Sequence, residues 1–273
     1  MIARLRAKLD PVYLRNRIMY VLAEHPPLSD DFNDPNSNVD TTEPHIVKRK
    51  FWSFEEGEES NNKNVLVSKD VKGLVVNPNF FDEEEVNALV HAMNEIGNEI
   101  TGWFEYHPGR DMYAMQPYPH VDQKMIPILS TLESQNRTKP TDWPKLSDFK
   151  ALTPVLRLQQ FLESGEFTAF AKSQPCLFVQ VQRVERGIPV GSHKDDLRKG
   201  GRVICTAVLK GENRVRVGDV EFRVRPGDIY ALSDQARFDV DHEVLPETSD
   251  RLSLTLRFGV VSDDEIKKRE EGT

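Results

Sequence analysis

The chain has little cysteine, no long hydrophobic run and no excess of positive charge, and each shortage excludes a class of protein. Cys176 and Cys205 stand in separate apolar runs, which indicates buried thiols rather than a disulfide framework. No apolar stretch approaches the roughly 20 residues that a membrane helix needs, and no secretory signal is present, so we expect no membrane association. The net charge of -8 argues against a generally basic protein that coats nucleic acid.

The length of 273 residues allows one sizeable domain and an extension. Residues 1–62 are predicted to form an N-terminal arm that is helical at first and then extended or partly disordered, because Pro, Asp, Asn, Ser and Glu dominate it. Within this arm, Phe51–Phe54 is an aromatic island that we expect to dock back on the domain or on a protein partner. Residues 63–262 form the predicted domain, and residues 263–273 form a charged tail. The two thiols suit a reducing compartment, and we expect an intracellular location, whether cytoplasmic, nuclear or mitochondrial.

Short alternating stretches between residues 176 and 257 predict a β-rich domain. The clearest case is a hairpin around Gly218 and Asp219, whose register should pair Val217 with Val220 and Arg216 with Glu221. About seven such strands with closely spaced turn signals favour a sandwich, jelly roll or barrel. The predicted fold class is therefore α+β, mainly β.

Two helices are predicted to cover the sheet. The first begins at Asp82, which forms a capping-box pattern with Glu85, and we expect it to end at Gly97. The second spans residues 152–170. Both have an apolar stripe at helical spacing, so each should pack one face on the sheet.

Two histidines and an aspartate follow one another in strand contexts. His193 and Asp195 are two residues apart, so on a strand both side chains leave the same face. His242 lies on the apolar face of a strand predicted over residues 238–244. Two imidazoles and one carboxylate make up the facial triad of non-haem Fe(II) oxygenases. The sequence therefore predicts that His193, Asp195 and His242 bind a catalytic metal.

The segment Arg251–Arg257 is predicted to be a strand with two contrasting faces. Leucines occupy one face, and the other carries two guanidiniums and two hydroxyls. Such a polar face is costly to bury unless anions satisfy it. The alternative is an edge strand whose arginines point to solvent. The place of this strand just after His242 favours a role for Arg251 as a bidentate partner of the distal carboxylate of 2-oxoglutarate.

From Val65 to Val261 the chain resembles the AlkB-like Fe(II)/2-oxoglutarate-dependent dioxygenases, which repair or demethylate nucleic-acid bases. The residues that carry the resemblance are Gly187, His193-Lys-Asp195, His242, the spacing of Arg251 and Arg257, and the segments Asn77–Asp82 and Tyr113–Tyr118. The resemblance implies a double-stranded β-helix core with Fe(II) and 2-oxoglutarate as cofactors. It also implies that Arg251, Ser253, Arg257 and Gln182 contact the cosubstrate.

Two positions depart from the pattern of this family. Gln182 stands where the family usually has asparagine, and it keeps an amide that can donate to 2-oxoglutarate. Val184 stands where the family usually has a tyrosine, and it cannot replace a phenol. A hydrogen bond to a charged partner is worth about 1.5–3 kcal/mol, so its loss would weaken cosubstrate binding roughly ten- to a hundredfold.

The substrate class is predicted from cations and aromatic residues near these motifs. Arg198, Lys199 and Arg202 are candidate phosphate contacts, and Tyr113 and Tyr118 are candidate walls for a stacked base. These cations are equally typical of a solvated surface. The favoured function is demethylation or hydroxylation of an RNA or DNA base. The alternatives are a protein or small-molecule hydroxylase, and a catalytically weak scaffold that binds protein or RNA partners through its N-terminal arm.

Overall fold

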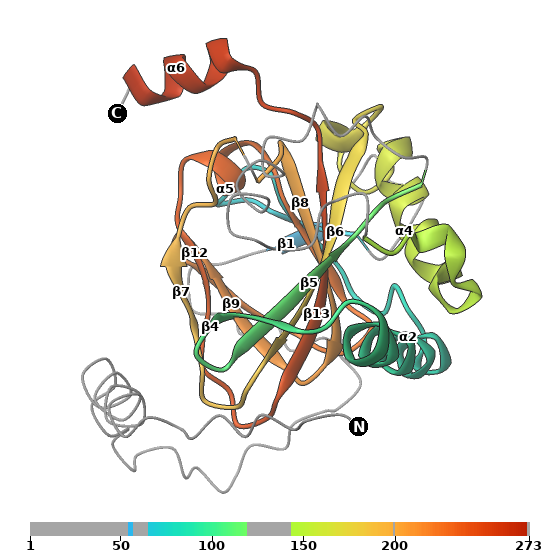
Figure 1. Cartoon of the computed structure of the whole chain (residues 1–273). Coiled ribbons are helices and arrows are strands. Elements are labelled where there is room, and N and C mark those ends of the chain that lie inside the picture. Colours follow the sequence, from blue (N-terminus) through green and yellow to red (C-terminus); the bar gives the residue numbers. More distant parts are fainter. Residues whose placement is uncertain (1–53, 57–64, 119–142, 199, 272–273) are drawn as a thin grey trace, which may run out of the picture. The chain divides into compact units, whose positions relative to one another are not determined.

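The computed structural model describes residues 54–56, 65–118, 143–198 and 200–271. All of these described residues belong to one compact unit (Figure 1). The predicted N-terminal helices and Lys199 lie outside the described residues. The proposed division into arm, domain and tail stays a prediction.

The described strands form two antiparallel sheets that pack against each other. In spatial order, the larger sheet contains β1 (Phe54–Glu56), β2 (Leu66–Ser68), β3 (Leu74–Asn77), β11 (Ile229–Leu232), β8 (Val203–Lys210), β13 (Arg251–Phe258), β6 (Cys176–Val184), β5 (Arg110–Met115) and β4 (Phe104–His107). The smaller sheet contains β10 (Val220–Val224), β9 (Asn213–Val217), β12 (His242–Val244) and β7 (Val190–His193). Side chains from both sheets, among them Ile204 and Phe222, share one buried cluster. This arrangement confirms the predicted fold class, which is mainly β with a jelly-roll core.

Two helices, α2 (Glu83–Glu95) and α4 (Thr153–Ser164), lie on the face of the larger sheet that is turned away from the smaller sheet (Figure 1). The predicted capping box is present, since Asp82 accepts from the main chain of Glu85 and the Glu85 side chain accepts from Asp82. Short helical turns follow at Ile96–Ile100, Leu146–Asp148, Lys150–Leu152 and Ala169–Ala171. No helix among the described residues is long and apolar enough to span a membrane.

Both helix ends differ from the prediction. The first helix does not stop at Gly97 but continues as a π-helical turn through Ile100, and a Cβ at Gly97 would lie 2.4 Å from the Trp103 ring. Glycine is thus needed here for close packing rather than for termination. The second helix ends earlier than residue 170, because Gly165 adopts a left-handed conformation with φ of 83°.

The strand β13 shows the predicted two-faced pattern. Leu252, Leu254 and Leu256 are buried in the core beneath the helices. The alternate residues, which include Arg251 and Arg257, face the space between the two sheets. The hairpin of β9 and β10 has the predicted register, with Val217 opposite Val220 and Arg216 opposite Glu221. Period-two patterning therefore placed these side chains correctly.

A strand was predicted over residues 238–244, but the structure has no strand before His242 in this segment. Residues Asp234–Phe238 form the short helix α5, and β12 begins only at His242. The main chain of Asp239 and Val240 donates back to the carbonyl of Gln235, which prevents strand pairing there. The buried Arg237 side chain holds this helical turn against a neighbouring loop. Long-range contacts have overridden the local alternation.

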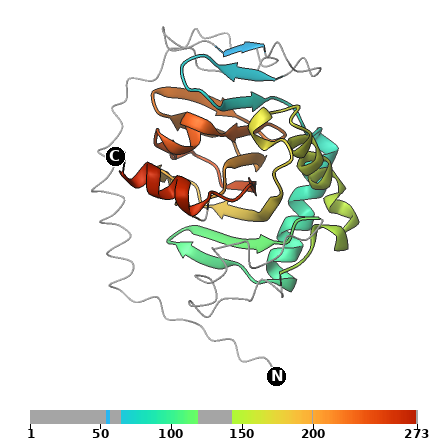
Figure 2. The ribbon, with the colours of Figure 1, turned by 90° about the horizontal axis from the view of Figure 1, so that it is seen from above.

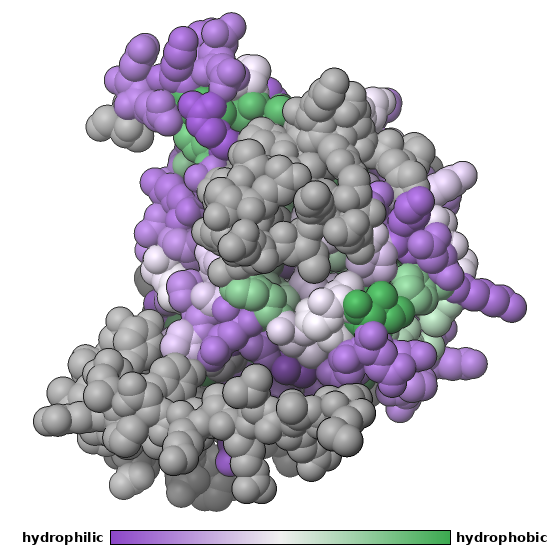
Figure 3. Space-filling view, viewed as in Figure 1, coloured by the Kyte–Doolittle hydropathy of each residue, from purple (hydrophilic) through white to green (hydrophobic). Residues whose placement is uncertain are grey.

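The edges and the end of the domain complete the fold. Figure 2 shows β1 and β2 at one edge of the larger sheet and β4 and β5 at the other. Phe54, the last residue of the predicted aromatic island, pairs with Ser68, and its ring contacts Phe222 with centroids 5.9 Å apart. Residues 51–53 lie outside the described part. The helix α6 (Asp263–Glu271) ends the described chain and presents a hydrophilic surface (Figure 3).

Candidate metal site and pocket

His193, Asp195 and His242 converge, although Asp195 lies beyond the end of the strand that was predicted to carry it together with His193. His193 ends β7, Asp195 follows that strand, and His242 opens β12 directly opposite His193. The Nε2 atom of His193 lies 3.6 Å from Oδ1 of Asp195, and the Nε2 atom of His242 lies 3.8 Å from Oδ2. One potential ligand atom from each residue lies within 4.8 Å of the other two. This spacing suits a single metal ion.

The protonation of these residues also fits Fe(II). Burial would raise the pKa of Asp195, but Arg257 and the histidines hold it well below its usual range, so the carboxylate is ionised. Burial lowers the pKa of His242 to about 4, so this imidazole is neutral at pH 7. The Nδ1 atom of His193 donates to the carbonyl of Gly191 at 2.7 Å, which leaves Nε2 directed at the other two ligands. Two nitrogens and one anionic oxygen form a donor set that Fe(II) accepts.

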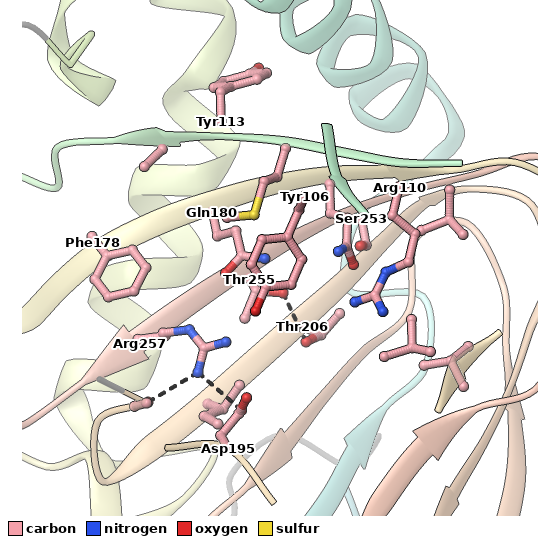
Figure 4. A pocket seen from close by; sticks show the side chains of 18 of the residues that line it. Tyr106, Arg110, Tyr113, Phe178, Gln180, Asp195, Thr206, Ser253, Thr255 and Arg257 are labelled. Carbon is pink, nitrogen blue, oxygen red and sulfur yellow. Dashed lines mark hydrogen bonds and ion pairs between the residues drawn. The ribbon is translucent and has the colours of Figure 1, made fainter. Parts of the chain in front are cut away.

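The triad lies in the wall of a pocket of about 850 Å³ between the sheets. The floor is a polar patch on β13, β6 and β8, and Thr206 and Thr255 share a hydrogen bond of 3.1 Å across it (Figure 4). The predicted contacts Ser253 and Gln182 lie opposite each other in the sheet, and both line this pocket. The three hydroxyls and the amide of Gln182 give the floor neutral hydrogen-bonding groups.

Arg251 is a buried cation at one end of the floor. Its side chain is only 4% exposed, and it donates to the main-chain carbonyls of Leu245 and Ile188. No carboxylate among the described residues forms an ion pair with it. Burial lowers the pKa of Arg251 to about 10, because burial disfavours the charged form, and the negative charge of Glu247 opposes that shift. A carboxylate from a ligand would offset the cost of burying this charge.

Arg257 occupies the other end of the floor and already has an anionic partner. Its Nη1 atom lies 3.0 Å from Oδ2 of Asp195 and 3.3 Å from the carbonyl of Gly200 (Figure 4). The two arginines of β13 are thus both turned to the pocket, as predicted, but their surroundings differ.

Tyr230 adds a phenol to the pocket, in which Val184 stands at the position where a tyrosine was expected. Val184 lies directly opposite Arg251 in the sheet and lines the pocket. Tyr230 lines the same pocket from β11, where it pairs with Thr206. Burial raises the pKa of Tyr230 to about 12, so the phenol keeps its proton and can donate. No local pattern marks Tyr230 as a pocket residue, because the position of β11 beside β8 is set by long-range pairing.

Tyr113, one of the two tyrosines predicted to form an aromatic wall, is among the residues that line the pocket. Although β5 borders the pocket, the Tyr113 ring lies in the core on the helix side of that strand (Figure 4). The Tyr113 hydroxyl donates to the carbonyl of Met93 at 2.8 Å, so it offers no face to a base. Tyr118 is 56% exposed but does not line the pocket. The main-chain N–H of Tyr118 donates to Oε1 of Gln159 in α4, and its carbonyl accepts from Nε2 of the same residue.

The predicted phosphate contacts also lie elsewhere. Arg198 forms an ion pair of 2.6 Å with Asp263, and Arg202 forms one with Glu265, so both cations are bound to α6. Neither residue lines the pocket. This pairing joins segments about sixty residues apart and could not be read from the local charge run.

The rim of the pocket instead carries aromatic residues and cations from β4 and β5. Tyr106 is 50% exposed, and the Arg110 guanidinium lies 5.8 Å from the centre of its ring (Figure 4). The Trp103 ring contacts the Arg183 guanidinium, which lies 4.3 Å from its centre but is not among the residues that line the pocket. Tyr106, Arg110 and Trp103 all line the pocket. Stacking and cationic groups are therefore present at its mouth.

No protein-family model and no curated protein matches the chain. Among solved structures, the chain is similar to a prolyl-4-hydroxylase from Pseudomonas putida, with 18% identity over 70% of this chain and 94% of that chain and a TM-score of 0.43. It is similar to a prolyl hydroxylase from Trichoplax adhaerens in complex with a hypoxia inducible factor peptide, with 13% identity, 75% and 89% coverage and a TM-score of 0.45. It is also similar to OsALKBH1, with 17% identity, 68% and 96% coverage and a TM-score of 0.43.

Proposed function

We propose that this chain is an Fe(II)- and 2-oxoglutarate-dependent dioxygenase that oxidises a base of RNA or DNA. The observation that carries the proposal is the cluster of His193, Asp195 and His242 in a pocket that also holds the buried cation Arg251. Such a pocket suits a cosubstrate that chelates the metal at one end and carries a carboxylate at the other. Where the oxidised carbon is an N-methyl group, the product would lose formaldehyde.

The chain's own residues have separate tasks in this reaction. Bound Fe(II) and 2-oxoglutarate supply the oxidising chemistry with O₂, since 2-oxoglutarate yields succinate and CO₂ and one oxygen atom enters each of succinate and substrate. His193, Asp195 and His242 hold the metal, and Arg257 keeps the Asp195 carboxylate ionised and oriented. Arg251 orients the cosubstrate through its distal carboxylate.

Neutral donors complete the cosubstrate site. Ser253 and Gln182 lie next to Arg251 on the floor, and Tyr230 adds a protonated phenol from the adjoining strand. The absence of a phenol at Val184 is the feature that favours the alternative of a catalytically weak scaffold. The phenol of Tyr230 in the same pocket favours a catalytic protein instead.

The rim supports a nucleic-acid substrate over a peptide or a small aliphatic molecule. A hydroxylase for those substrates would be expected to have a mouth without stacking and cationic groups. Here Tyr106 offers half of its surface, and Arg110 lies beside it. An aromatic ring beside a cation can bind single-stranded nucleic acid without sequence specificity, because every base has a π-face and every linkage has a phosphate.

The test combines ligand binding with turnover. Under anaerobic conditions the protein should bind Fe(II) and then 2-oxoglutarate, and admission of air should release succinate. A short single-stranded oligonucleotide with N-methylated bases should increase succinate and yield formaldehyde, whereas His193→Ala should give neither product. Succinate stimulated only by peptides would assign the same chemistry to a protein hydroxylase. Absence of metal-dependent 2-oxoglutarate binding would reject the dioxygenase.

A further inference from the structure

Arg237 of α5 is fully buried although it is charged. Its guanidinium donates three hydrogen bonds, and every acceptor is a main-chain carbonyl: Nε donates to Gly201 at 3.0 Å, Nη1 to Asp195 at 3.1 Å and Nη2 to Asp196 at 3.0 Å. These acceptors lie at both ends of the loop 195–201. One side chain thus joins the beginning of the loop, which carries the metal carboxylate, to its end.

The loop is shaped around this guanidinium. A Cβ at Gly200 would lie 2.2 Å from Nη2 of Arg237 and 2.9 Å from the carbonyl of Asp196, so only glycine leaves room there. The main chain of Gly200 also donates back to the carbonyl of Asp196 at 2.8 Å. The turn and the arginine therefore depend on each other.

Stability alone does not account for this arginine. Burial lowers the pKa of Arg237 to about 10, and the negative charge of Asp195 opposes that shift. Carbonyl acceptors satisfy its N–H groups but do not neutralise its charge. An apolar side chain of similar size could fill the space without the cost of dehydrating a cation. What the guanidinium adds is a planar fork that fixes several acceptors at once.

We propose that Arg237 is a positioning residue for the metal carboxylate: it fixes the main chain of the loop 195–201 so that the Asp195 side chain meets both histidines. Arg257 acts on the carboxylate itself, whereas Arg237 acts on the peptide units that bear it. The inference rests on the metal site of the proposed function. It concerns how well that site is formed before a metal arrives, because a preformed ligand loses less freedom on binding.

The test measures Mn(II) affinity by calorimetry and the electron paramagnetic resonance spectrum of bound Mn(II). Arg237→Met should lower the affinity at least tenfold at a temperature where circular dichroism shows a folded protein. The Mn(II) affinity of Arg237→Lys should lie between those of the wild type and Arg237→Met, because lysine keeps the charge but lacks the planar fork. Gly200→Ala should reproduce the loss with Arg237 still present, since the added Cβ would displace the guanidinium.

A matched control separates positioning from general destabilisation. Leu158 of α4 is fully buried in the core beneath the larger sheet, away from the loop 195–201. Leu158→Ala should lower the melting temperature but leave Mn(II) affinity within about twofold of the wild type. The resonance spectrum should change in Arg237→Met and remain that of the wild type in Leu158→Ala.

The outcomes distinguish failure of the positioning role of Arg237 from failure of the metal site itself. If the wild type binds Mn(II), His193→Ala does not, and folded Arg237→Met binds within twofold of the wild type, the positioning role is overturned and the metal site stands. If Arg237→Met does not fold, undiminished affinity in folded Arg237→Lys and Gly200→Ala overturns it equally. A wild type that binds no Mn(II) rejects the metal site, and the role of Arg237 with it.

Discussion

The Nη1 atom of Arg257 lies 3.0 Å from Oδ2 of Asp195, and this ion pair connects the central strand β13 to the metal carboxylate. Arg251, six residues earlier on the same face, has only main-chain carbonyls as hydrogen-bond acceptors among the described residues. One arginine of the strand is thus neutralised from within the protein. Arg251 forms no ion pair within the described residues, and in the proposed function it would bind the carboxylate of a ligand.

Replacement of Arg251 should therefore affect 2-oxoglutarate most strongly. In Arg251→Met we expect an affinity about a hundredfold lower, because a charge-assisted bidentate pair is worth about 3 kcal/mol. The measurement is anaerobic titration of the Mn(II)-loaded protein with 2-oxoglutarate. Arg198→Met, which removes an exposed cation paired with Asp263, should change the affinity less than about twofold. Equal losses in both variants would mean that the pocket has been misassigned.

Tyr230 should contribute to cosubstrate affinity, whereas Tyr113 should not. Tyr230→Phe removes a phenol from the pocket and should weaken 2-oxoglutarate binding about tenfold. Tyr113→Phe removes a hydroxyl that donates to Met93 in the core, so it should lower the free energy of unfolding by about 1 kcal/mol and leave binding unchanged. Titration and chemical denaturation of both variants test this contrast. If Tyr230→Phe binds 2-oxoglutarate as tightly as the wild type, Tyr230 does not replace the phenol that is absent at Val184.

Metal binding should release one proton below neutral pH. Hydrogen bonding of His193 to the Asp195 carboxylate raises the pKa of His193 above its usual 6.5, whereas burial lowers that of His242 to about 4. Between these values the metal-free site holds its proton on His193. Apparent Mn(II) affinity should rise about tenfold per pH unit as the pH increases toward the pKa of His193, and then level off. Calorimetry in buffers with different ionisation enthalpies counts the protons, and a release of two would show that His242 is also charged.

Nucleic-acid binding should depend on the rim of the pocket and not on the surface beside α6. Arg110→Ala should weaken the binding of short single-stranded RNA and reduce the salt slope by about one unit, while Tyr106→Ala should weaken binding with the slope unchanged. Arg202→Ala and Tyr118→Ala serve as controls, because neither residue lines the pocket. Fluorescence anisotropy across a salt series measures both quantities. Binding that is independent of salt, or losses confined to the controls, would contradict the assigned interface.

Local patterns in the sequence predicted those features that a single element determines. The alternation along β13, the hairpin register of β9 and β10, and the capping box of α2 follow from neighbouring residues alone. The cluster of the candidate metal ligands could also be predicted, because His193 and Asp195 are two residues apart and His242 starts a strand that pairs with His193.

Features set by distant contacts could not be predicted in this way. An aromatic residue on β5 can face either the pocket or the helices, and packing against α2 decides that Tyr113 faces the helices. Arg198 and Arg202 read as free cations until the ion pairs with α6 are known. The alternation over residues 238–244 suggested a strand, but β12 begins only at His242, and the hydrogen bonds of Arg237 to Gly201 and Asp195 hold the helical turn that precedes it.

The two faces of β13 also have a consequence for how this gene can vary. Because consecutive residues belong alternately to the leucine core and to the polar floor, the deletion of one codon within residues 251–257 would exchange the two environments for every residue beyond it. A guanidinium would then enter the core, and a leucine would line the pocket. The effect of a substitution in β13 should therefore depend on which face the residue occupies. A single-codon insertion or deletion should prevent folding wherever in the strand it occurs. A deep mutational scan that includes such length changes would show an uninterrupted block of loss there.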